Sequence, residues 1–135
     1  MIELTLAMAE TAVRAAQQKA RDLGSPMTVT VVDEAGRLVL SARGDGTGFL
    51  TPDTSRAKAV AAAAFRKSTT EMADAAAKGS GFWRTMPAAI PEPVLPTQGG
   101  APLTRGGRII GGIGCGGGTG EQDQQCADAG AAALV

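Results

Sequence analysis

The run 108–126 carries the residue types best suited to holding a small ligand. It begins with β-branched residues, continues through glycines around Cys115, and ends in a polar segment with Glu121 and Asp123. This pattern predicts a strand that enters a helix through a glycine loop, which places backbone N–H groups and side chains at one rim. We therefore expect a ligand to contact this loop, at Gly114, Cys115, Gly116, Gly117 and Asp123.

The glycines at 112–117 match the spacing of a dinucleotide-binding loop, but their surroundings argue against that function. The preceding strand is the second arm of a predicted hairpin, and no acidic residue follows about twenty positions later to hold a ribose. Glu121 and Asp123 would also repel a pyrophosphate at the start of the helix. The glycines are better explained by tight packing and by close approach between subunits.

The two cysteines and the absence of histidine restrict the chemistry further. Cys115 and Cys126 are eleven positions apart, with no Cys-x-x-Cys pair and no histidine in 135 residues. This excludes a tetrahedral zinc site and every Ser–His or Cys–His catalytic pair, so we predict no metal site. Both cysteines are expected to be reduced small hydrophobes, with a reactive Cys115 thiolate as the alternative if that residue is exposed.

Charged and aromatic residues elsewhere suggest how an anionic ligand could be held. Arg43 ends a predicted strand, and Lys58 lies among alanines, where we expect it to face the ligand rather than solvent. Phe82 and Trp83 are expected at the mouth of a pocket, with a simple loop anchor as the alternative. Glu92, between two prolines, has no evident structural duty.

Periodicity predicts one domain over 1–135 with the order α-β-β-α-α-β-β-α. Two antiparallel hairpins form a central sheet flanked by helices, an α+β or three-layer fold. The segment 79–96, rich in proline, is predicted to be an irregular, lid-like loop. The expected helices are 2–23, 51–67, 68–79 and 120–134, and the expected strands are 27–33, 37–43, 101–105 and 108–115.

Composition describes a protein without a strong electrostatic bias. Thirteen Lys and Arg balance thirteen Asp and Glu, so nucleic acid and anionic membranes are not expected as partners. The opening residues show no signal peptide, and the predicted location is cytoplasmic. Aromatic residues make up 3% of the chain, and a core of small residues buries little area per residue, so we expect a homo-oligomer.

Five motifs in order along the chain resemble the GlcG/HbpS-like family, also described as haem-degrading or PduO C-terminal-like domains. The resemblance implies a central antiparallel sheet, oligomers that are often octamers, and haem or corrinoid binding in some members. Because this chain has no histidine, haem would be held without an imidazole ligand. The motifs are Val31–Val39, Arg56–Ala62, Gly99–Leu103, Ile110–Gly117 and Glu121–Ala127.

These observations together predict a small-molecule-binding domain with a pocket near a subunit interface and haem as a candidate cofactor. The alternative is a cofactor-independent lyase, isomerase or tautomerase acting on a small anionic metabolite, with Lys58, Glu92 and Glu121 as catalytic residues. A purely structural assembly subunit is a third hypothesis. The expected ligand-binding residues are Arg43, Lys58, Phe82, Trp83, Gly99, Gly100, Gly114, Cys115, Gly116, Gly117 and Asp123.

Overall fold

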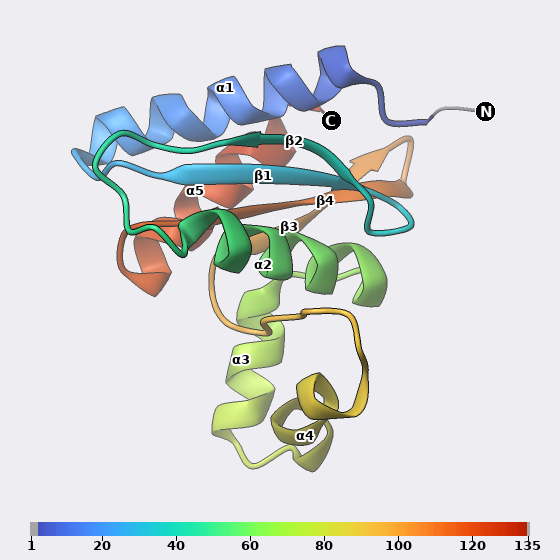
Figure 1. The fold of residues 1–135 in the computed structure, drawn as a ribbon. Helices are drawn as coiled ribbons and strands as arrows, with labels where there is room; N and C mark the ends of the chain where they lie inside the picture. The colour runs from blue at the N-terminus through green and yellow to red at the C-terminus, as the bar shows by residue number, and fades with distance from the viewer. Residues whose placement is uncertain (1–2, 135) are drawn as a thin grey trace.

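A four-stranded antiparallel sheet in the order β2-β1-β4-β3 lies between two layers of helices (Figure 1). The structure is a computed structural model that describes residues 3–134. Both hairpins form as predicted, and they join where β1 pairs with β4 from Thr28↔Gly116 to Asp33↔Gly111. The α+β fold is therefore confirmed. Its strands are β1 (Thr28–Asp33), β2 (Leu38–Ala42), β3 (Gly100–Arg105) and β4 (Arg108–Gly116).

The two faces of the sheet carry different helices and separate hydrophobic clusters. Helices α1 (Leu6–Leu23) and α5 (Gly120–Ala132) pack against each other over one face, where Val29 and Val31 point. Helix α2 (Thr51–Phe65) covers the opposite face, where Val32 points. Alternation along β1 thus supplies both cores, as the pleat of a strand requires.

Glycines in β4 allow α2 to lie directly on the sheet. A Cβ atom at Gly112 would collide with the carbonyl oxygen of Ala59, and one at Gly114 with the carbonyl oxygen of Ser55. The part of the glycine motif that lies in the strand therefore serves tight packing inside one subunit, in agreement with the packing interpretation of the sequence.

The segment 79–96 is not the irregular loop that its prolines predicted. Helix α3 (Thr69–Ala77) is followed by a further helix, α4 (Gly81–Ala89), which has Pro87 inside it. The order is therefore α-β-β-α-α-α-β-β-α. Ser80 caps α4 by accepting a hydrogen bond from the Trp83 N–H at 3.5 Å, and Phe82 and Trp83 make edge-to-face contacts with Phe65 of α2.

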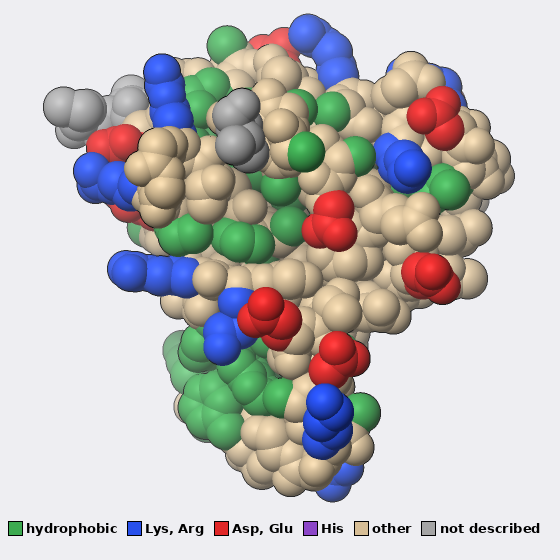
Figure 2. All heavy atoms as spheres, turned by 180° about the vertical axis from the view of Figure 1, so that it is seen from behind, with side chains coloured by type: hydrophobic (Ala, Val, Ile, Leu, Met, Phe, Trp, Pro, Cys, Tyr) green, Lys and Arg blue, Asp and Glu red, His purple; other side chains and the backbone are tan. Residues whose placement is uncertain are grey.

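Helices α3 and α4 project away from the sheet and carry exposed hydrophobic surface. Figure 2 shows hydrophobic side chains gathered on this lower part of the molecule. Phe82 on α4 is 55% exposed, and Phe49, in the loop before α2, is 82% exposed. None of the described helices is both long and apolar enough to cross a bilayer.

Candidate functional site

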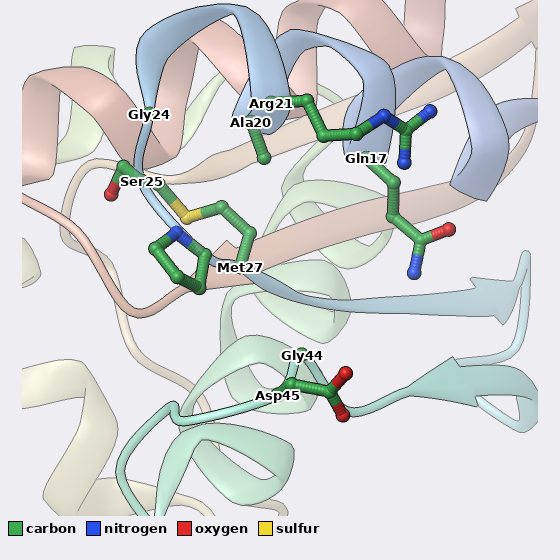
Figure 3. Close-up of a pocket in the computed structure, with 9 residues that line it drawn as sticks. Gln17, Ala20, Arg21, Gly24, Ser25, Met27, Gly44 and Asp45 are labelled. Atoms are coloured by element: carbon green, nitrogen blue, oxygen red, sulfur yellow. The ribbon is translucent and has the colours of Figure 1, made fainter.

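A cavity of about 390 Å³ lies at the end of the sheet where α1 stops and β1 begins (Figure 3). We call it the α1 groove. Its volume falls within the range of about 300–1,000 Å³ that is typical of small-molecule sites. The lining residues come from α1, from the turn into β1 and from the loop after β2: Gln17, Ala20, Arg21, Gly24, Ser25, Pro26, Met27, Gly44 and Asp45.

Local sequence explains how the groove forms. Helix α1 ends at Gly24, whose φ of 66° is left-handed, and the Ser25 N–H donates to the carbonyl oxygen of Ala20 at 3.0 Å. Glycine tolerates this conformation because it has no Cβ, and Pro26 then prevents the helix from resuming. The chain turns back beneath the last turn of α1, which brings Met27 under the helix.

The groove offers complementary polar groups over an apolar floor. Arg21 and Gln17 come from the α1 wall, while Asp45 comes from the opposite wall (Figure 3). Within residues 3–134 neither Arg21 nor Asp45 forms an ion pair. The thioether of Met27, which is 2% exposed, adds a soft and polarizable contact. The groove can therefore accept a ligand with both an apolar body and a carboxylate.

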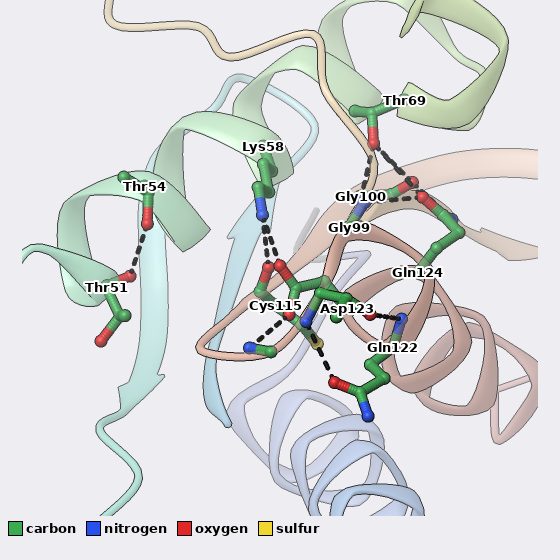
Figure 4. A network of polar contacts seen from close by, with 12 residues as sticks. Thr51, Thr54, Lys58, Thr69, Gly99, Gly100, Cys115, Gln122, Asp123 and Gln124 are labelled. Atoms are coloured by element: carbon green, nitrogen blue, oxygen red, sulfur yellow. Dashed lines mark hydrogen bonds and ion pairs between the residues drawn. The ribbon is translucent and has the colours of Figure 1, made fainter. Parts of the chain in front are cut away.

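A buried ion pair joins α2 to α5 near the end of β4 (Figure 4). Lys58 Nζ is 3.0 Å from Asp123 Oδ2 and also donates to the carbonyl oxygen of Cys115 at 3.0 Å. Asp123 Oδ1 accepts a hydrogen bond from the Gly118 N–H at 2.9 Å. The side chains of Lys58 and Asp123 are 8% and 6% exposed. The sequence had suggested that Lys58 faces a ligand. In the structure its ammonium is instead paired with Asp123 inside the protein and does not point into a pocket.

The predicted glycines at 99 and 100 make room for this pair and for its neighbours. A Cβ at Gly99 would lie 2.8 Å from Lys58 Nζ. The Gly99 N–H donates to Gln124 Oε1 at 2.7 Å, and the Gly100 N–H donates to Thr69 Oγ1 at 2.7 Å (Figure 4). These contacts tie the start of β3 to α5 and α3.

The glycine loop connects the ion pair with the groove. A Cβ at Gly118 would lie 2.6 Å from Met27 Cε and 2.8 Å from Ser25 Oγ, and one at Gly117 would lie 2.7 Å from the carbonyl oxygen of Pro26. The loop therefore packs against the back of the segment Ser25–Met27 that lines the groove. Gly114, Cys115 and Gly116 all belong to the buried end of β4 and do not line the groove.

Both cysteines are buried, which decides between the two interpretations of Cys115. Burial raises the pKa of the Cys115 thiol well above its usual value, and burial likewise raises the pKa of Cys126 to about 11. The thiols are therefore protonated small hydrophobes at neutral pH, and the structure does not support a reactive Cys115 thiolate.

The remaining predicted residues occupy separate places. Arg43 is exposed and directly precedes Gly44, but it does not itself line the groove. Phe82 and Trp83 lie on the projecting α4, away from the groove (Figure 1). Glu92 lines a cavity beside α2 with Arg56 and Asp53, and the exposed Glu121 lines a polar cavity with Ser68 and Gln98. The structure does not bring Lys58, Glu92 and Glu121 together.

None of the ligand-binding residues predicted from the sequence lines the groove. The larger polar and apolar side chains that sequence reasoning missed there are Gln17, Arg21, Met27 and Asp45. Gln17 and Arg21 belong to the polar side of an amphipathic helix, and nothing in their spacing separates them from ordinary surface residues. The Gly24 and Pro26 stop signal was the available clue, because it marks a sharp turn beside Arg21. The opposite wall, from a segment about twenty residues later, depends on the pairing of β1 with β2.

A β2-β1-β4-β3 sheet, helices α1 and α5 on one face, α2 on the other and a groove at one end of the sheet define a small α+β domain. The family model described as "Haem degrading protein HbpS-like" matches residues 4–132. The chain therefore belongs to the HbpS-like family.

Individual relatives agree with this assignment. An uncharacterized 15.0 kDa protein of Citrobacter freundii, from the dhaT-dhaS intergenic region, is 32% identical over 93% of this chain and 87% of its own length. A crystal structure of a double mutant of Streptomyces reticuli HbpS is 38% identical, with a TM-score of 0.86 over 98% of this chain and 87% of that one. The crystal structure of a PduOC:heme complex is 29% identical, with a TM-score of 0.87 over 97% and 94%.

Proposed function

We propose that this chain is a small-molecule-binding domain that holds a tetrapyrrole such as haem in the α1 groove without histidine ligation. The observation that carries the proposal is the groove itself, with Met27 on its floor and Arg21 on its wall. The haem complex of a structurally similar relative supports the choice of ligand class.

The residues of the groove suit a weakly ligated tetrapyrrole. The chain contains neither histidine nor tyrosine, and the raised thiol pKa values leave no cysteine thiolate to bind iron at neutral pH. Pro26 gives an exposed apolar face for part of a flat ring, with Ala20 and Met27 buried beneath it, and Arg21 can pair with a propionate. Bound haem would supply a redox-active iron, while this chain would supply the shape and charge that hold it.

Titration with haemin tests the proposal. We expect a saturable shift of the Soret band, whereas slow partitioning without saturation would contradict the proposal. Gln17→Trp places a bulky side chain in the groove and is expected to weaken binding at least about tenfold, equivalent to about 1.4 kcal/mol. Thr11→Trp is the matched control, because Thr11 is exposed on the same helix, does not line the groove and makes its side-chain hydrogen bond to Ala7 within the helix.

The weak ligation has its own consequence. If the ring and its propionates supply most of the affinity, haemin and metal-free protoporphyrin IX should bind with dissociation constants within about threefold of each other, or about 0.65 kcal/mol. A preference for haemin of a hundredfold or more would reveal a strong axial ligand and would contradict the proposed mode of binding.

We also propose that the protein is a cytoplasmic homo-oligomer. Phe49, Leu50 and Phe82 are 82%, 56% and 55% exposed, and burying such side chains against another copy would add apolar contact area that a core rich in alanine lacks. Sedimentation that gives the monomer mass at micromolar concentration would rule the oligomer out.

Binding is favoured over the cofactor-independent enzyme for a geometric reason. That hypothesis needs Lys58 and the carboxylates of Glu92 and Glu121 around one ligand. Lys58 is instead paired with Asp123, and Glu92 and Glu121 line different cavities.

A further inference from the structure

We infer that Lys58 and Asp123 are positioning residues that set the shape of the α1 groove through the glycine loop. Neither residue lines the groove. The inference rests on the proposed function for its ligand-binding consequence, while its structural part stands on contacts within the chain.

The first step is the attachment of the loop to the pair. Asp123 uses one carboxylate oxygen for Lys58 Nζ at 3.0 Å and the other for the Gly118 N–H at 2.9 Å. Lys58 also donates to the carbonyl oxygen of Cys115, at the end of β4. The pair therefore fixes both the start of the loop and its tip relative to α2 and α5.

The second step is the contact between the loop and the groove wall. A Cβ at Gly117 would lie 2.7 Å from the backbone carbonyl oxygen of Pro26, and one at Gly118 would lie 2.6 Å from the Met27 methyl group and 2.8 Å from Ser25 Oγ. Closely packed atoms transmit a displacement instead of absorbing it. A shift of the loop tip towards this segment therefore meets the Pro26 carbonyl and displaces the Met27 methyl group, which changes the groove wall.

The third step is energetic. Two nearly enclosed charges lose most of their hydration, so a buried ion pair gives little net stability compared with well-packed apolar residues. The pair also fixes the position of the loop, because the Asp123 carboxylate that Lys58 holds accepts a hydrogen bond from the Gly118 N–H at 2.9 Å. We attribute the presence of the pair at this point to the placement of the loop.

Asp123→Asn tests the inference with little change in volume. The asparagine can still accept from the Gly118 N–H through its oxygen, but its NH₂ group then faces the Lys58 ammonium, donor against donor. We expect faster hydrogen exchange at the Gly118 amide and a changed ¹³C-methyl resonance for Met27. We also expect haemin affinity to fall roughly three- to thirtyfold, as typical coupling between neighbouring structural elements allows.

Internal and matched controls separate positioning from general destabilisation. The methyl resonances of Met72 and Met86, which belong to the hydrophobic cluster on the α2 face, should not move. Asp128→Asn changes an exposed carboxylate on the same helix and should leave the Met27 resonance in place. If Asp123→Asn folds poorly, the double variant Lys58→Met/Asp123→Asn leaves no charge buried alone and tests the same displacement.

The outcomes are distinct. Unchanged Met27 and Gly118 signals in a folded variant would overturn the inference, as would a uniform shift of all methionine signals, which would indicate a general structural role. If the parent protein does not bind haemin, the proposed function fails, and the methyl and exchange measurements still decide whether the pair positions the loop.

Discussion

Replacing Lys58 with methionine should destabilise the protein strongly. The substitution keeps the aliphatic stem but removes the ammonium, which leaves the Asp123 carboxylate, 6% exposed, with the Gly118 N–H as its remaining hydrogen-bond donor. Removing one partner of a buried pair typically costs about 3–5 kcal/mol. The free energy of unfolding of a folded domain is roughly 5–15 kcal/mol in total, so this substitution removes a large part of the stability.

The expected fall in melting temperature is roughly 10–20 °C, because each kcal/mol corresponds to roughly 3–5 °C for a domain of this size. Thermal and urea unfolding at pH 7 measure it. Lys78→Met is the control, since Lys78 is exposed at the end of α3 and should change the free energy of unfolding by less than about 0.5 kcal/mol.

A second arm isolates the unpaired charge as the cause. Lys58→Met/Asp123→Asn should recover about half or more of the stability that Lys58→Met loses, because the neutral amide is less costly to bury than a lone carboxylate. A Lys58→Met protein within about 1 kcal/mol of the parent would refute the reasoning, since a pair that is truly enclosed cannot lose one charge so cheaply.

Three further predictions follow from the packing and the titrating groups. Neither Cys115 nor Cys126 should react with iodoacetamide at pH 8 until the protein is unfolded, because burial raises both thiol pKa values; rapid labelling of the native protein would contradict this. Gly114→Ala should unfold the protein or destabilise it by about 3 kcal/mol or more, because its Cβ meets the backbone of α2, whereas Gly81→Ala, with open space around it, should lie within about 0.5 kcal/mol of the parent in urea unfolding. Burial acts to raise the pKa of Asp33, but hydrogen bonds within the β1–β2 turn and the ion pair with Arg37 outweigh burial and lower this pKa below its usual value. The carboxylate therefore stabilises the fold at neutral pH and loses this effect as the pH falls through the lowered pKa. Asp33→Asn should melt at a lower temperature than the parent at pH 7 and at the same temperature near pH 2, and an equal difference at both pH values would contradict this.

Local chemistry in the sequence was enough to predict most of the fold. Helix α1 ends at Gly24 in a left-handed cap, Gly106 and Gly107 turn between β3 and β4 with positive φ, and Thr119 with Gln122 forms a capping box at the start of α5. Such signals act within a few residues and depend little on the rest of the chain. Family membership was also carried by the sequence, through motifs whose order and spacing match.

Helix α4 shows where local signals failed. Pro87 and the prolines that follow predicted a loop, but Phe82 and Trp83 gain contacts with Phe65 of α2 that hold the segment as a helix. This stabilisation comes from a residue some twenty positions away, which no local pattern could include.

The site was decided by tertiary structure. Lys58, Asp123 and the glycine loop can all be found in the sequence, but the contact between them depends on α2 lying over β4 and on α5 following β4. The Lys58 ammonium, which was expected to face a ligand, is therefore buried against Asp123. The α1 groove depends on β1 pairing with β2, which sets Asp45 opposite Arg21. Whether a side chain is buried, and which distant side chain it faces, depends on how the sheet and its helical layers pack together, and a local sequence pattern does not contain that information.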